Sequence, residues 1–122
     1  MSRYISIRGW LECDDDIYTN VIKFINKYEI EYEKFYLSEE QIKYYQKGWV
    51  FNNYQIGWRR YIFYGADVKS YNTAFFTKQL EDICQLKFNI DGKFFLDEES
   101  GESSVCIEIK DDTIVETHNK LE

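Results

Sequence analysis

The sequence predicts an α+β fold in which an antiparallel sheet carries helices on one face. Three observations predict this class. Apolar residues alternate in a strand-like manner near the start of the chain, apolar residues recur at helical spacing in later segments, and strand-like segments separated by turn residues fill the end.

The first strand and the first helix follow one another directly. In residues 3 to 11, one side of the chain carries Ile5, Ile7, Gly9 and Leu11, and the other carries Tyr4, Ser6, Arg8 and Trp10. This period of two is typical of a half-buried strand. Three aspartates follow at positions 14 to 16 as N-cap and first-turn carboxylates, and the apolar residues after them predict a helix from about residue 15 to 30.

The middle of the chain predicts a short helix and a hairpin. Ser38 and Gln41 form a capping-box pattern, and we expect Gly48 to close this helix in a left-handed conformation. Residues 49–51 and 58–68 are strand-like, and the Asn and Gly residues between them tolerate positive φ in a hairpin loop. Gly65 indicates a bulge or bend in the second of these strands.

The last third predicts one helix and three strands. Asn72 or Thr73 can cap a helix that ends near Leu86, and Asp91-Gly92 then provides a turn. The strands are expected at residues 93–97, 105–109 and 113–117, with turns at 98–101 and 110–112. They suggest an antiparallel meander at the end of the chain.

The order of these elements matches the split β-α-β motif of a ferredoxin-like sandwich, extended by extra C-terminal strands. Two helices would cover one face of the sheet. The other face stays exposed unless the short helix or a partner covers it, and its residues include Tyr4, Arg8 and Trp10. A chain of 122 residues that is 44% hydrophobic has the size and composition of a single domain, residues 1–122.

The net charge of −7 belongs to the C-terminal region. The chain has 22 acidic and 15 basic side chains, and the last 26 residues hold nine of the former and two of the latter. The remaining 96 residues are therefore balanced, at 13 of each. Such an asymmetry favours a basic partner. The alternative interpretation is a solvated edge that keeps the protein soluble and discourages pairing between sheets.

The sequence contains no recognisable catalytic, metal or phosphate-binding motif. His118 is the single histidine and lies close to the C-terminus, and the cysteines, Cys13, Cys84 and Cys106, form no C-x-x-C pair. We therefore expect no enzyme activity, cofactor or metal, and we expect the thiols to be reduced and packed as small hydrophobes. A signal peptide and a membrane span are both missing from the sequence, which predicts a cytoplasmic protein.

Nucleic-acid binding is disfavoured by the charge. Affinity for a phosphate backbone comes chiefly from Lys and Arg, and this chain is net acidic. Aromatic residues on a sheet can stack on bases, but only Arg8, Arg59 and Arg60 could begin to supply the basic surround that such surfaces need.

Two stretches resemble segments of a known family. They are residues 4–15, YISIRGWLECDD, and residues 57–68, GWRRYIFYGADV. Both are similar to segments of small bacterial immunity proteins, which are encoded beside polymorphic or contact-dependent growth inhibition toxins. The resemblance implies a cytoplasmic antidote that binds the toxic C-terminal domain of a cognate effector, often a nuclease, and blocks its active site or substrate path.

The residues expected to bind a partner fall into two groups. The acidic group consists of Asp97, Glu98, Glu99, Glu102, Asp111 and Asp112, and the second group consists of Trp10, Trp49, Trp58 and Arg59. Carboxylates can occupy the phosphate-binding groove of a basic nuclease, and Trp is enriched where interfaces concentrate binding energy. We expect a monomer or weak dimer. The alternatives are a small-molecule-sensing or general protein-interaction module with an aromatic pocket and, third, an enzyme that uses buried carboxylates and tyrosines.

Overall fold

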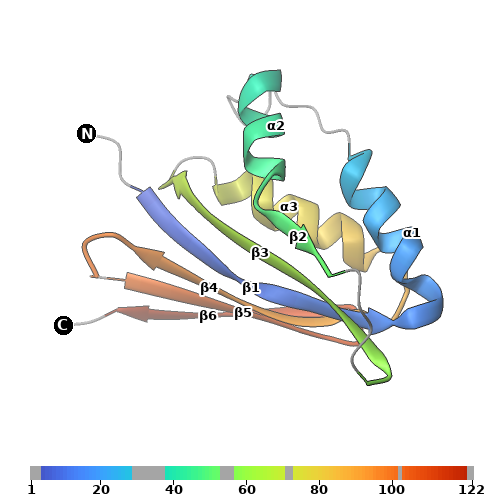
Figure 1. Ribbon diagram of the computed structural model, residues 1–122. Helices are drawn as coiled ribbons and strands as arrows, with labels where there is room; N and C mark the ends of the chain where they lie inside the picture. Colours follow the sequence, from blue (N-terminus) through green and yellow to red (C-terminus); the bar gives the residue numbers. More distant parts are fainter. Residues whose placement is uncertain (1–3, 29–37, 53–56, 71–72, 102, 121–122) are drawn as a thin grey trace.

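The computed structural model describes residues 4–28, 38–52, 57–70, 73–101 and 103–120 (Figure 1). Within these ranges the chain forms one sheet of six strands and three helices. In chain order they are β1 (Tyr4–Asp14), α1 (Asp15–Asn26), α2 (Glu39–Gln46), β2 (Trp49–Phe51), β3 (Arg59–Lys69), α3 (Thr73–Cys84), β4 (Asp91–Glu98), β5 (Ser103–Lys110) and β6 (Thr113–Lys120).

The strand order is β2-β3-β1-β4-β5-β6, and every neighbouring pair is antiparallel. β1 and β2 therefore run in the same direction with β3 between them, and β3 and β4 run in the same direction with β1 between them. These are two interlocked split β-α-β units. The order confirms the predicted ferredoxin-like arrangement, and β5 and β6 extend it beyond β4 as predicted.

All three helices lie on one side of the sheet (Figure 1). The predicted alternation in β1 is confirmed, because Ile7 and Leu11 are fully buried under the helices while Arg8 is exposed on the opposite side. Phe94 at the centre of β4 and Ile83 on α3 are also fully buried. Since α2 joins α1 and α3 on the same side, no described helix covers the other side of the sheet.

A chain of hydrogen bonds ties the three helices to the edge of the sheet. The Trp49 Nε1–H donates to Gln79 Oε1 at 3.3 Å, and Gln79 Nε2 donates to Gln46 Oε1 at 2.8 Å. Gln46 Nε2 in turn donates to the backbone carbonyl of Ile25 at 2.7 Å. Gln79 is only 1% exposed, so these bonds satisfy polar groups that water does not reach.

Two predicted helix ends differ from the structure. α1 ends at Asn26 instead of continuing to residue 30, and Asp14 occupies the predicted N-cap position, but its side chain makes no capping hydrogen bond. The Ser38–Gln41 capping box is present, but Gly48 does not have positive φ, so its predicted left-handed closure is wrong. A Cβ at Gly48 would lie 2.7 Å from the ring of Tyr64, so close packing of that ring explains the glycine.

Two other glycine predictions are wrong, namely a turn at Asp91-Gly92 and a bulge at Gly65. Asp91-Gly92 begins β4 instead of forming a turn, and the chain reverses earlier, where Lys87 and Asn89 have positive φ. Gly65 marks no bulge, because the pairing of β3 with β1 continues through it without an extra residue. The positive φ of Gly57 does agree with the predicted hairpin loop, while positions 53–56 of that loop lie outside the described residues.

Candidate functional site

The side of the sheet opposite the helices, called the open face below, carries most of the exposed large apolar side chains. Strand alternation puts Tyr4, Val50, Tyr61, Phe63, Phe95 and Val115 there. Phe63 is 45% exposed and Phe95 is 37% exposed, although both lie in the middle of long strands. Exposed apolar side chains gathered on one surface mark an interaction site.

Trp10 lies at the centre of this aromatic group. On β1 it faces Phe63 of β3 on one side and Lys93 of β4 on the other. The rings of Tyr61 and Phe63 stack along β3 with centroids 6.4 Å apart, and the Lys93 ammonium lies 5.5 Å from the ring centre of Phe95. Aromatic side chains from three adjacent strands therefore form one surface.

Three pairs of polar side chains lie on this surface. The Arg8 guanidinium forms an ion pair with Asp97, and the Ser6 hydroxyl donates to Asp67 at 2.6 Å. The Trp10 indole N–H donates to Glu12 at 3.2 Å. These pairs offset charge around the rings and leave the centre of the open face mainly apolar.

A shallow groove of about 620 Å³ lies on the open face. It is lined by Arg8, Gly9, Trp10, Phe63, Tyr64, Gly65 and Phe95. The backbone of Gly65 is exposed at its base, and a Cβ there would have no heavy atom within 4 Å. A side chain from another molecule could therefore approach the backbone of β3 at this point.

The open face continues to the start of β3. Trp58 is 84% exposed beside Gly57, and a second hollow of about 290 Å³ is lined by Glu12, Gly57, Trp58, Arg59 and Tyr61. The Arg59 guanidinium already has partners within the chain, because it donates to Asp14 at 2.9 Å and to Asp91 at 3.1 Å. We therefore assign Arg59 a structural role at the end of the sheet, whereas Trp58 is accessible to a partner.

The predicted aromatic anchors differ in accessibility. Trp10 and Trp58 lie at the surface, but Trp49 is only 5% exposed and packs against Tyr64 and Phe76 in the core. Trp49 does not present its ring to a partner in this structure. It lies on the helix side of β2, and the sequence alone did not indicate which side of so short a strand it would occupy.

The predicted acidic residues are divided between two ends of the sheet. Asp97, Glu98 and Glu99 lie where β4 turns into β5, whereas Asp111 and Asp112 form the turn after β5. An eight-residue strand separates the two turns by about 23 Å. Glu102 lies outside the described residues. The carboxylates that are continuous in sequence thus do not form one continuous surface.

Asp112 has a structural role in its turn. Its carboxylate accepts the backbone N–H groups of Asn89 at 3.0 Å and Ile90 at 2.8 Å. Asp111 and Asp112 both have positive φ, which suits the two-residue turn between β5 and β6 and is tolerated by Asp.

Sequence reasoning missed that acidic residues distant in sequence lie at the same end of the sheet as this turn. Asp14 ends β1, Asp15 and Asp16 begin α1, Asp91 begins β4, and the Asp111 N–H donates to Asp91 at 2.8 Å. We call Asp14, Asp15, Asp16, Asp91, Asp111 and Asp112 the acidic end. This clustering of aspartates could be found only from the strand order, which brings the end of β1 beside the start of β4.

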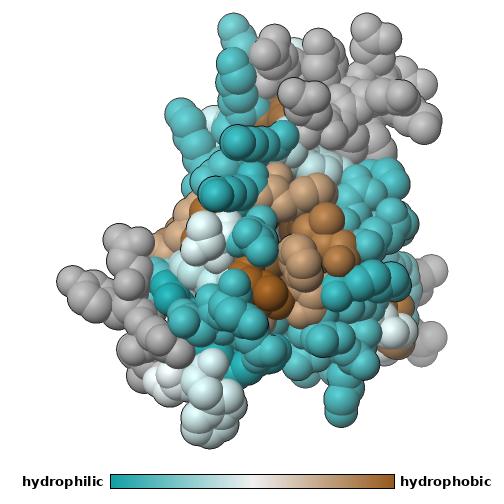
Figure 2. Space-filling view, turned by 90° about the vertical axis from the view of Figure 1, so that its right-hand side faces the viewer, coloured by the Kyte–Doolittle hydropathy of each residue, from teal (hydrophilic) through white to brown (hydrophobic). Residues whose placement is uncertain are grey.

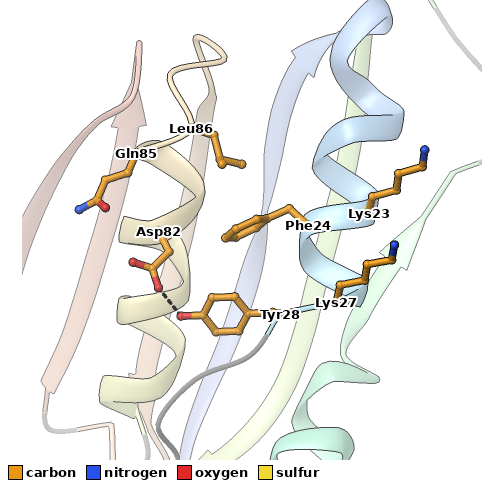
Figure 3. Close-up of a pocket in the computed structure, with 7 residues that line it drawn as sticks. All are labelled: Lys23, Phe24, Lys27, Tyr28, Asp82, Gln85 and Leu86. Carbon is orange, nitrogen blue, oxygen red and sulfur yellow. Dashed lines mark hydrogen bonds between the residues drawn. The ribbon is translucent and has the colours of Figure 1, made fainter.

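A second groove, of about 680 Å³, lies between α1 and α3 (Figure 3). Phe24 on α1 and Tyr28 just after its end point toward α3, and the Tyr28 hydroxyl donates to Asp82 at 2.5 Å. Lys23 and Lys27 point away from α3. Figure 2 shows the side of the molecule that is on the right in Figure 1, where apolar residues are enclosed by hydrophilic ones.

The cysteines lie in two environments. Cys13 and Cys84 are buried, and burial is the main cause that raises the pKa of each thiol to about 11. Cys106 is partly exposed and lies opposite Phe95 on the open face. Among the described residues, no group of His, Cys, Asp and Glu side chains is arranged to hold a metal ion.

The described helices are all too short or too polar to cross a membrane. Comparisons of the chain with protein-family models, with curated proteins and with solved structures gave no match in any of the three.

Proposed function

We propose that this protein is an immunity protein that binds a cognate toxin domain, with a basic nuclease domain as the expected target, and blocks its active site or substrate groove. The observation that carries the proposal is the open face, where aromatic side chains from β1, β3 and β4 are exposed together. A sheet that buries one face under three helices and leaves an aromatic face bare is suited to docking against another protein.

The resemblance to immunity proteins supports the same surface. The two segments that carry it, residues 4–15 and 57–68, contain β1 and β3, which pair along their whole length at the centre of the sheet. These strands supply Trp10, Tyr61 and Phe63 to the open face. The segments on which the resemblance depends are therefore neighbours in space.

Charge supports a basic target. The acidic end lies at the same end of the sheet as Trp58, so a basic domain attracted to the carboxylates would meet the aromatic residues of the open face. Long-range attraction raises the rate of association, and the buried aromatic contacts then slow dissociation. The toxin domain would be inhibited because its active site or substrate groove is occluded. The immunity protein would need no catalytic chemistry of its own.

The direct test is co-expression with the product of the adjacent reading frame. We expect its C-terminal domain to be toxic alone, harmless together with this protein, and recovered with it as a stable complex. Absence of a complex at micromolar concentrations of both proteins would refute the proposal.

Charge and aromatic variants identify the contact surface. If the β4–β5 end docks, Glu98→Lys combined with Glu99→Lys slows association with the toxin domain. If the open face docks, Trp10→Ala acts mainly on the dissociation rate. Tyr44→Ala on α2 is a matched control, because Tyr44 is 67% exposed on the helix side.

The groove between α1 and α3 supports a second candidate function, a small-molecule-sensing module. Its volume of about 680 Å³ is sufficient for a small ligand, and Phe24, Tyr28 and Leu86 give it apolar walls. A thermal-shift screen against metabolites discriminates between the two functions. Stabilisation by a metabolite, with none by a basic protein domain, would favour this second candidate.

A further inference from the structure

Gly65 occupies the middle of β3 although nothing in the described fold requires a glycine there. Its pairing with Arg8 is regular, its φ is not positive, and a Cβ would meet no heavy atom within 4 Å. Glycine inside a strand is less favourable than alanine, because its backbone loses more conformational freedom on folding. The chain therefore carries this cost without a packing or backbone reason of its own.

The other five glycines each have a reason inside the chain. A Cβ at three of them would lie closer than 3.0 Å to another atom of the fold, and the other two have positive φ. The first group consists of Gly9, Gly48 and Gly92, and the second consists of Gly57 and Gly101. Gly65 alone combines open space for a Cβ with a φ that is not positive, and a strand glycine of this kind suits the close approach of a ligand or another chain.

The walls of this space define the group that fits it. Phe63 precedes Gly65 on the same side of β3, Arg8 lies directly across on β1, and Phe95 lies across from Arg8 on β4. Trp10 completes the groove beside Phe63. A group above Gly65 would therefore touch a backbone floor, aromatic rings and one guanidinium.

Charge argues against a charged group as the occupant of the space above Gly65. A lysine or arginine from a partner would approach Arg8 and Lys93, and a carboxylate would approach Asp97, which already pairs with Arg8. A nucleotide would bring phosphates to a molecule of net charge −7. A neutral aromatic ring can pack on the exposed rings and stack on the Arg8 guanidinium.

We propose that the space above Gly65 receives an aromatic side chain from the partner protein. This inference rests on the proposed function, since it names what the partner contributes to the open face. The acidic end then steers the partner, and the inserted ring anchors it. Gly65 acts as the floor of the site, and Arg8 is held against the ring by Asp97.

The test uses small probes and the intact chain. N-acetyl-tryptophanamide is titrated into the ¹⁵N-labelled protein, with N-acetyl-lysinamide and uridine monophosphate in parallel titrations. We expect the aromatic amide to shift the backbone resonances of Gly9, Gly65 and Phe95 in the millimolar range, as is usual for fragments, and the lysine amide to shift none of them.

Filling the space should remove this binding without unfolding the strand. The Gly65→Val variant should bind the aromatic amide at least about tenfold more weakly than the wild type does. The melting temperature of this variant should be equal to or above that of the wild type. Gly65→Ala adds one methyl group and provides a milder variant should valine disturb the fold. Thr117→Ile, on the exposed side of β6, is the matched control and should leave probe binding unchanged.

Three results would overturn the inference. They are the absence of localised shifts with the aromatic amide, equal binding by Gly65→Val, and tighter binding of uridine monophosphate than of the aromatic amide. Tighter binding of uridine monophosphate would indicate that a nucleotide, and not a protein side chain, occupies the space above Gly65. None of these results depends on toxin neutralisation, so failure of the probe experiment and failure of the proposed function are distinguishable.

Discussion

At the residue scale, the hydroxyl of Tyr28, two residues after the end of α1, binds α3 through a single hydrogen bond to Asp82 (Figure 3). Asp82 also accepts from Lys78 at 2.9 Å, so the carboxylate keeps one partner when the hydroxyl is removed. We expect Tyr28→Phe to lower the free energy of unfolding by about 1 kcal/mol, because a partly exposed hydrogen bond to a charged group is lost. Urea unfolding monitored by circular dichroism measures the change.

The same residue makes stability depend on alkaline pH. Burial, followed by the hydrogen bond to Asp82, raises the pKa of Tyr28 well above its usual value of about 10. A raised pKa means that the folded state holds the proton more tightly, so the contribution is complete below pH 10 and is lost as pH rises further. The free energy of unfolding should therefore fall less steeply above pH 10 in Tyr28→Phe than in the wild type. Identical slopes would contradict this assignment.

At the scale of elements, the hydrogen bonds through Gln79 connect the helices to β2 at the edge of the sheet. Gln79→Ala would remove the acceptor of the Trp49 indole N–H and the donor to Gln46 Oε1. We expect a loss of about 2–3 kcal/mol in the free energy of unfolding, measured by urea denaturation. Gln85→Ala, on the exposed side just after α3, is the control and should change it by less than about 0.5 kcal/mol.

The turn between β5 and β6 gives a second element-scale prediction. Asp112→Ala removes the acceptor of two backbone N–H groups and should destabilise the protein by about 1–2 kcal/mol. Asp111→Gly should be tolerated, because its φ of 50° suits glycine. Equal melting temperatures for the two variants would show that Asp112 acts as a surface charge only.

The sequence predicted the elements better than it predicted the surfaces. Alternation in β1 and the capping box at Ser38 are local patterns, so they identified the buried side of a strand and the start of a helix. The acidic end could not be predicted in the same way, because Asp14 and Asp111 reach the same end of the sheet only through the pairing of strands distant in sequence. The sequence shows Gly65 as a glycine within a strand-like segment, but it does not show the empty space above this position on β3.

At the scale of the whole molecule, charge and exposed aromatic surface contribute to different steps of binding. The net charge of −7 should make the association rate with a basic domain fall as salt is added, because attraction between the separated proteins is screened. The dissociation rate should change little, since the aromatic contacts are short-range. Stopped-flow measurements at low and physiological salt test this, and an association rate independent of salt would exclude electrostatic steering.

The three thiols report which face of the molecule a partner covers. Cys106 is partly exposed opposite Phe95, whereas Cys13 and Cys84 are buried and burial raises the pKa of both to about 11. Because the thiolate is the reactive form, we expect iodoacetamide at pH 8 to alkylate Cys106 first.

A partner on the open face should slow alkylation of Cys106 by at least about tenfold, in proportion to the time the face is covered. Mass spectrometry of the labelled peptides measures the rate in the free protein and in the complex, and labelling in urea serves as the control in which all three thiols react. An unchanged rate for Cys106 in a stable complex would move the contact away from the open face, to the acidic end or the helix side.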